Sequence, residues 1–189
     1  PPPPPPPPIK STAHHRYQHC SPTRRSSDLI KSAIYLNKDT IVLIAGEGEE
    51  EANLKNLIRT YKLTNKVYLL GKIGYNELSS FYKLCDVFCM SSISRNEGFG
   101  IVQLEAMIFE KPIITTNIPG SGIVFGNLND VTGKVVPIRD EKAIAKAINF
   151  LTENKSVSET YGLNGKARVE SIFSKDNMIL KTIDLYTNL

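Results

Sequence analysis

The chain has 189 residues, of which 41% are hydrophobic and 22% are charged, and its formal net charge is +4. This is the composition of a globular domain long enough to bury a core, and three cysteines are too few for a disulfide scaffold. No apolar run reaches the ~20 residues of a membrane span, and the first residues lack the apolar centre of a signal peptide. These features predict a cytoplasmic protein with reduced thiols.

Residues 1–29 differ from the rest of the chain. They begin with eight consecutive prolines and hold nine of the 12 prolines and all three histidines. Four cations and one acid give them a net charge of +3, so residues 30–189 carry only +1. Because they lack hydrophobic periodicity and partly resemble translated sequencing adapter, we predict a disordered arm that is not native to the protein. The alternatives are a ligand for a proline-binding domain and a metal site made by His14, His15, His19 and Cys20.

Residues 30–189 read as alternating strands and helices, after a helix that ends near residue 36. Apolar runs rich in β-branched residues predict buried strands at 40–45, 67–70, 87–90, 112–116 and 134–136. Helical periodicity is found at 49–61, 76–85, 99–109, 141–151, 156–171 and 175–186. This alternation predicts an α/β fold, a Rossmann-like parallel sheet with helices on both faces. Ligands of such sheets bind at the carboxyl ends of the strands.

The loop after the first of these strands reads Gly46-Glu-Gly-Glu-Glu-Glu51. It starts like a dinucleotide fingerprint, but a glutamate stands where the third glycine belongs, and three acids would repel a pyrophosphate. A nicotinamide cofactor is therefore disfavoured. A tight turn into a helix and one wall of a phosphate site remain as interpretations of this loop. No phosphate-binding Walker loop occurs in the sequence.

The segment Glu97-Gly-Phe-Gly-Ile-Val-Gln-Leu-Glu105 holds the densest set of candidate site residues. Gly98 and Gly100 flank a helix start, whose free N–H groups attract an anion such as a diphosphate. Glu105 lies two turns into that helix, where a carboxylate suits the diol of a ribose, and Glu97 lies beyond the anion, where a hexose would sit. The alternative is that both glutamates are solvated helix acids.

This segment, followed by Ala106-Met107 and Lys111-Pro112, resembles the Glu-x7-Glu signature of family 4 retaining glycosyltransferases. Further motifs of that family match in the same order, at residues 44–48, 67–71, 85–92, 117–122 and 131–137. The resemblance covers about residues 30–189. It is most similar to bacterial mannosyl- and related transferases of surface polysaccharide synthesis.

The resemblance implies that residues 30–189 are the carboxyl-terminal, donor-binding half of a GT-B fold. Such enzymes move a hexose from a nucleoside-diphosphate sugar to an acceptor hydroxyl with retained anomeric configuration, without a metal or other cofactor. Glu97 is then the candidate catalytic residue beside the hexose, and Glu105 holds the ribose. Main-chain groups complete the implied donor site: the turn at Gly46, the base contacts near Lys72 and Ile73, and the diphosphate contacts near Phe99, Gly100, Ile101 and Val102.

The sequence differs from the pattern of this family in two respects. The position of its diphosphate-binding Arg and Lys falls in the arm, so no residue inherits that role. Its amino-terminal half, which supplies acceptor contacts and any peripheral contact with the inner face of the plasma membrane, has no counterpart here. We therefore expect a fragment that is inactive alone. We also expect no nucleic-acid binding, because the chain after residue 29 lacks clustered cations with aromatic residues. The alternatives are a nucleotide-sugar-binding module that works with a separate chain, and a sugar-nucleotide epimerase relative.

Smaller features receive structural interpretations. Phe81 and Tyr82 are predicted to belong to a helix core, and Cys85 and Cys89 to be buried thiols without a metal. Arg95 either approaches the donor or faces water.

Overall fold

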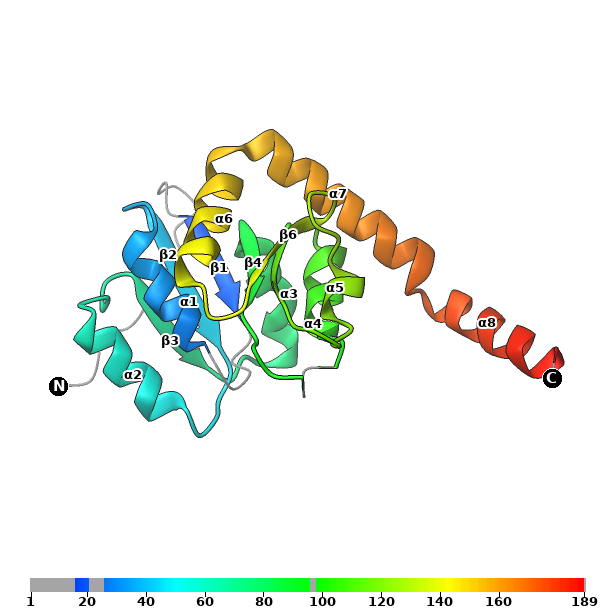
Figure 1. Ribbon diagram of the computed structural model, residues 1–189, viewed down its shortest axis with the longest axis horizontal. Helices are drawn as coiled ribbons and strands as arrows, with labels where there is room; N and C mark the ends of the chain where they lie inside the picture. Colours follow the sequence, from blue (N-terminus) through cyan, green and yellow to red (C-terminus); the bar gives the residue numbers. More distant parts are fainter. Residues whose placement is uncertain (1–15, 21–25, 96–97, 189) are drawn as a thin grey trace.

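The computed structural model describes residues 16–20, 26–95 and 98–188 (Figure 1). Within these ranges all strand pairs are parallel and form one six-stranded sheet of order β3-β2-β1-β4-β5-β6. The strands are β1 (Arg16–Cys20), β2 (Thr40–Ala45), β3 (Val67–Gly71), β4 (Val87–Met90), β5 (Ile113–Asn117) and β6 (Gly133–Pro137). The predicted α/β class, a Rossmann-like parallel sheet, is confirmed.

Helices connect the strands as predicted, although some of their bounds differ from the predicted ones. The helices are α1 (Ser27–Ser32), the 3-10 turn η1 (Ala33–Tyr35), α2 (Glu51–Thr60), α3 (Tyr75–Leu84), α4 (Ile101–Ile108), α5 (Ile123–Gly126), α6 (Glu141–Glu153), α7 (Lys155–Ile172) and α8 (Lys175–Thr187). The short helix α5 was not predicted, because four residues are too few to display a helical period. Helix α4 begins two residues later than its hydrophobic pattern indicates, because Gly100 takes a left-handed conformation.

The order of the strands reverses between β1 and β4. The chain first lays β2 and β3 beside β1 and then returns to place β4 on its other side. The carboxyl edge of the sheet beside this reversal is the place where a parallel α/β sheet forms a ligand crevice.

The prediction that residues 1–29 form a disordered arm is wrong for the part that the structure describes. Strand β1 pairs along its length with β2 and also with β4, as in the register His19↔Leu43 and His19↔Phe88. Leu29 and Ile30, in the helix that follows, are fully buried. A strand is required there, because β2 and β4 would otherwise leave backbone groups unpaired in the middle of the sheet. Its polar sequence, Arg-Tyr-Gln-His-Cys, hides it from an analysis that expects apolar central strands. Residues 1–15, with His14 and His15, lie outside the described residues.

The two faces of the sheet bury separate cores because side chains alternate along each strand. In β4, Val87 and Cys89 point to a core shared with α1, α2 and α6, whereas Phe88 and Met90 point to a core shared with α3, α4 and α5. Figure 1 shows these two sets of helices on opposite sides of the sheet. The carboxyl edge between them is thus framed by helix starts from both layers.

Helices α7 and α8 end the chain differently. Helix α7 packs against α4 and α6, whereas α8 extends away from the sheet after Ser174 (Figure 1). Several apolar side chains of α8 are exposed, among them Leu180 and Tyr186. No helix in the described part of the chain combines the length and the apolar character that crossing a bilayer requires.

Candidate functional site

The first wall of the candidate site is formed by the turns that follow β2 and β3. The backbone N–H of Gly46 donates to the carbonyl of Gly71 at 2.6 Å, and both glycines have positive φ angles, 118° and 68°. A residue with a Cβ would be strained in either position. Beyond this junction Lys72 is exposed, while the side chain of Ile73 packs against the sheet. The structure thus brings Gly46, Lys72 and Ile73 together at the carboxyl edge.

Helix α4 presents its first turn at the same edge. Gly100 precedes it with φ 71° and ψ 64°, and a Cβ at this position would lie 2.5 Å from Cε of Met90. Ile101 is exposed and Val102 is half-buried. Their backbone N–H groups stand in the first turn, where no preceding carbonyl of the helix can accept them. This turn offers donors and a positive helix end to an anion.

The backbone before α4 is held by the segment that carries α5. The carbonyl of Gly98 accepts hydrogen bonds from the N–H of Gly122 at 2.6 Å and from Oγ of Ser121 at 3.2 Å. The buried amide of Gln103 donates to the carbonyls of both Phe99 and Ile123. The loop that enters α4 is therefore bonded on both sides before any ligand arrives.

An aromatic cluster packs against the loop that enters α4. The ring of Phe99 lies 5.4 Å from that of Phe173 and 6.4 Å from that of Phe125. Arg168 of α7 lies over Phe125 and Phe173, and its guanidinium donates to the carbonyls of Phe125 and Gly126. The sequence analysis missed Gln103 and Arg168, because the contacts that they make join segments about 20 and 40 residues apart.

The carboxylate of Glu105 is engaged by a side chain from another helix. The hydroxyl of Tyr82, on α3, donates to Oε2 of Glu105 at 2.8 Å. Tyr82 is 2% exposed, whereas Glu105 is half-buried. Burial raises the pKa of the Tyr82 hydroxyl, and the hydrogen bond to this carboxylate raises it further. The hydroxyl therefore keeps its proton and donates it in the hydrogen bond to Glu105. The prediction that Tyr82 belongs to a helix core describes its ring but missed its hydroxyl.

Glu97, the predicted catalytic residue, lies outside the described residues. Its described neighbour Arg95 is exposed and places its guanidinium against Gly120, in the loop after β5. Gly120 has a φ of 73°, and a Cβ there would meet Nη2 of Arg95 at 2.1 Å. Arg95 therefore stands between two loops of the carboxyl edge.

A cavity of about 400 Å3 lies at this edge, beside the reversal of strand order. It opens between the starts of α1, α2 and α6, and its lining includes the cations Lys31 and Arg139 and the acids Asp28, Glu50 and Glu141. The sequence analysis assigned no cation to this region, because Lys31 and Arg139 lie about 100 residues apart in the chain.

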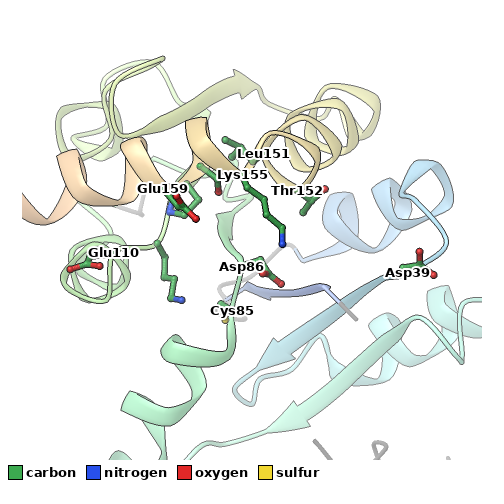
Figure 2. Close-up of a pocket in the computed structure, with 11 residues that line it drawn as sticks. Asp39, Cys85, Asp86, Glu110, Leu151, Thr152, Lys155 and Glu159 are labelled. Carbon is green, nitrogen blue, oxygen red and sulfur yellow. The ribbon is translucent and has the colours of Figure 1, made fainter. Parts of the chain in front are cut away.

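A second cavity, of about 560 Å3, lies at the opposite edge of the sheet (Figure 2). Its lining includes Asp39, Asp86 and Pro112, which directly precede β2, β4 and β5. Lys155 and Glu159 of α7 border it. Because it is at the amino ends of the strands, this cavity is separate from the start of α4 and from Glu105.

Cys85 lines that second cavity, and the effect of burial on the pKa of its thiol can be tested. Burial raises the pKa of its thiol from the ordinary value of 9.0 to about 12. The unfolded chain then gains thiolate at a lower pH than the folded chain, so the stabilisation is complete below pH 9 and declines as the pH approaches 12. By pH 10 this thiol should lower the free energy of unfolding by roughly 1–2 kcal/mol. Urea titrations at pH 8 and pH 10 should show a smaller decline for Cys85→Ala than for wild type, and equal declines would contradict the prediction.

Comparisons with known proteins agree on one family. The model of the family "Glycosyl transferases group 1" matches residues 18–168, and so begins within β1. O-antigen chain mannosyltransferase C of Escherichia coli is 35% identical over 148 residues, 78% of this chain and 39% of that enzyme. Capsular polysaccharide biosynthesis glycosyltransferase CapM of Staphylococcus aureus is 43% identical over 133 residues, 70% of this chain and 34% of CapM.

A solved structure supports the fold. Anabaena HepE in complex with UDP superposes with a TM-score of 0.84 at 20% identity, over 93% of this chain and 50% of that one. The chain thus spans half or less of the length of these relatives.

Proposed function

This chain belongs to the group 1 glycosyl transferase family, and on that premise we propose that it is the donor-binding half of a retaining glycosyltransferase. The full enzyme would transfer a hexose from a nucleoside-diphosphate sugar to an acceptor hydroxyl in the synthesis of a surface polysaccharide or glycolipid. In this reaction the bond between the anomeric carbon and the phosphate oxygen breaks. A bond to the acceptor oxygen forms on the same face of the sugar, and the acceptor proton is released.

The arrangement of α4 carries this proposal. Its first turn offers unpaired N–H groups at the carboxyl edge, and the preceding loop is already fixed by Gly122, Ser121 and Gln103. Donors that are aimed before the reaction stabilise charge on a leaving diphosphate without the cost of reorganising. Because α4 begins at Ile101, Glu105 lies about one turn into the helix and not the predicted two, and its carboxylate would meet the ribose that follows the diphosphate.

The two ends of the donor, the base and the hexose, would be bound on either side of this helix start. Main-chain groups near Lys72 and Ile73 would meet the base, since the turn after β3 is at the same edge and is tied to Gly46. Glu97 would face the hexose and stabilise positive charge at its ring. UDP bound to the similar fold of HepE supports a nucleoside diphosphate as the ligand class.

The acceptor is proposed to bind outside this chain. The curated relatives are more than twice as long as the segments that match it. We therefore expect the 189-residue chain to bind donor without ordinary turnover. A donor-hydrolysis or transfer assay with enzyme-like rates would contradict this part of the proposal.

Donor binding can be tested by calorimetry with UDP, GDP and ADP and their sugar conjugates. At least one nucleotide-sugar should bind, and Glu105→Ala should weaken its binding by about 1–3 kcal/mol because the ribose loses its acceptor. Glu159→Ala, which removes an exposed acid of α7 at the opposite edge, should leave affinity unchanged. If wild type and Glu105→Ala bind equally well, Glu105 does not hold the ribose. If no nucleotide-sugar binds, the proposed function is wrong.

A further inference from the structure

The hydrogen bond between Tyr82 and Glu105 joins two helices that the sequence separates. Tyr82 lies near the end of α3 and Glu105 in the middle of α4. The ring of Tyr82 stacks on Phe109, with centroids 5.5 Å apart and planes at 15°, and lies 6.0 Å from the ring of Phe88. Packing between two rings leaves the buried phenol little freedom, so its hydroxyl is a fixed point on the inner side of α4.

The partner of this hydroxyl is a flexible side chain. A glutamate on a helix surface has three rotatable bonds and loses their freedom when a ligand fixes it, at a cost of up to ~2 kcal/mol. A hydrogen bond of 2.8 Å to Oε2 sets the direction of the Glu105 carboxylate before a ligand arrives. Among the described residues, Tyr82 is the only hydrogen-bond donor to this carboxylate. A carboxylate has about four acceptor sites, so the held group can still accept two hydroxyl donors.

Helix α3 also connects this fixed point to the loop proposed for the base. The helix starts at Tyr75, directly after Lys72 and Ile73, and reaches Tyr82 within the same rigid element. At its start the N–H of Gly74 donates to Glu77, a capping contact that fixes how the chain enters the helix. One element therefore sets both the base loop and the orientation of the carboxylate.

We propose that Tyr82 is a positioning residue that holds the carboxylate of Glu105 ready for the 2′- and 3′-hydroxyls of a ribonucleotide donor. The site then selects ribonucleotides over nucleotides that lack these hydroxyls. This inference rests on the proposed function, because it requires Glu105 to meet the ribose.

The test compares UDP with 2′,3′-dideoxy-UDP by calorimetry on the full 189-residue chain. Wild type should prefer UDP by roughly 10-fold or more, and Glu105→Gln should lose most of this preference. Tyr82→Phe, which removes only the hydroxyl, should weaken UDP binding by about 5-fold and leave 2′,3′-dideoxy-UDP binding unchanged. If Tyr82 had only a structural role, Tyr82→Phe would weaken the binding of both nucleotides by the same factor.

Tyr161→Phe is the matched control. Tyr161 is also a buried tyrosine whose hydroxyl donates to an acid, Asp130 at 3.2 Å, but it lies on α7. This variant should keep the full preference for UDP. If thermal melting shows that Tyr82→Phe is not folded, Tyr82→Met replaces it, because methionine also lacks the hydroxyl and adapts to the apolar space.

The outcomes separate the two proposals. If Glu105→Gln loses the preference but Tyr82→Phe retains it in full, Tyr82 does not position the carboxylate, and the ribose role of Glu105 stands. If wild type binds both ligands equally, the ribose role itself is wrong, and the inference falls with it. If UDP does not bind but another nucleoside diphosphate does, the same pair of variants is measured with that nucleotide and its dideoxy form.

Discussion

Replacing Gly162 with alanine should lower the free energy of unfolding by about 3 kcal/mol. Gly162 is buried on α7, where this helix crosses the end of α4. A Cβ at this position would lie 2.0 Å from the carbonyl oxygen of Glu110 and 2.7 Å from its carbonyl carbon. A backbone carbonyl cannot rotate away as a side chain can. Glu110 itself has a left-handed φ of 56° in the turn that leads to β5, so relief requires moving α7.

Helix propensity predicts the opposite sign for this substitution. Alanine in a helix interior is better than glycine by about 1 kcal/mol, so a stabilised variant would show that the packing argument is wrong. Thermal unfolding should detect a fall in the melting temperature of roughly 6–12 °C. Gly165→Ala should cost less, because its Cβ would meet the Met107 side chain, which can shift. Gly48→Ala, with no atom near its Cβ, should stay within about 0.5 kcal/mol of wild type.

Asn127→Asp should destabilise the folded chain by about 3–5 kcal/mol at pH 7. Asn127 is fully buried after α5, and its amide nitrogen donates to Oγ1 of Thr115 at 2.9 Å and to the carbonyl of Lys134 at 3.0 Å. Its oxygen accepts a hydrogen bond from Thr132 at 2.9 Å. This amide thereby ties α5 to β5 and β6. A carboxylate has the same shape but would direct negative charge at groups that now receive a donor.

The pH dependence of this cost identifies its cause. Burial would raise the pKa of the new carboxyl above its unfolded value of ~3.9, so the penalty should be small below that pH and grow as the pH rises. Urea denaturation at pH 4 and pH 7 measures the change. Asn164→Asp is the control, because this amide is exposed and donates to the carbonyl of Val131, and it should cost less than about 1 kcal/mol at either pH. A cost that does not change with pH would point to lost packing instead.

Periodicity and composition were sufficient for the parallel sheet and most of its helices. Strands such as β2, apart from its first residue Thr40, and β4 are apolar because both of their faces are buried, and that pattern is visible without any tertiary information. Strand β1 breaks the rule with a polar sequence, so it was assigned to a disordered arm. Only the pairing of β1 with both β2 and β4 reveals its place in the sheet.

The candidate site likewise has features that the sequence predicts and contacts that only the tertiary structure reveals. The spacing from Gly98 and Gly100 to Glu105 predicts a helix start with a carboxylate two turns into that helix, because local geometry follows from residue order. The structure begins α4 at Ile101, so Glu105 lies only about one turn into it. The contacts that hold this helix come from elsewhere: Tyr82 from α3, and Gly122 from the segment that precedes α5.

The sequence by itself determined the class of fold, and it predicted both the edge of the sheet for a ligand and the two glutamates as candidate donor contacts, since each of these depends on periods and spacings along the chain. Only the tertiary structure showed that β1 is a central strand, that Gly122 and Ser121 hold the loop before α4, and that Tyr82 donates a hydrogen bond to Glu105. These features depend on which distant segments meet, and hydrogen bonds across 20 or more residues leave no local pattern in the sequence.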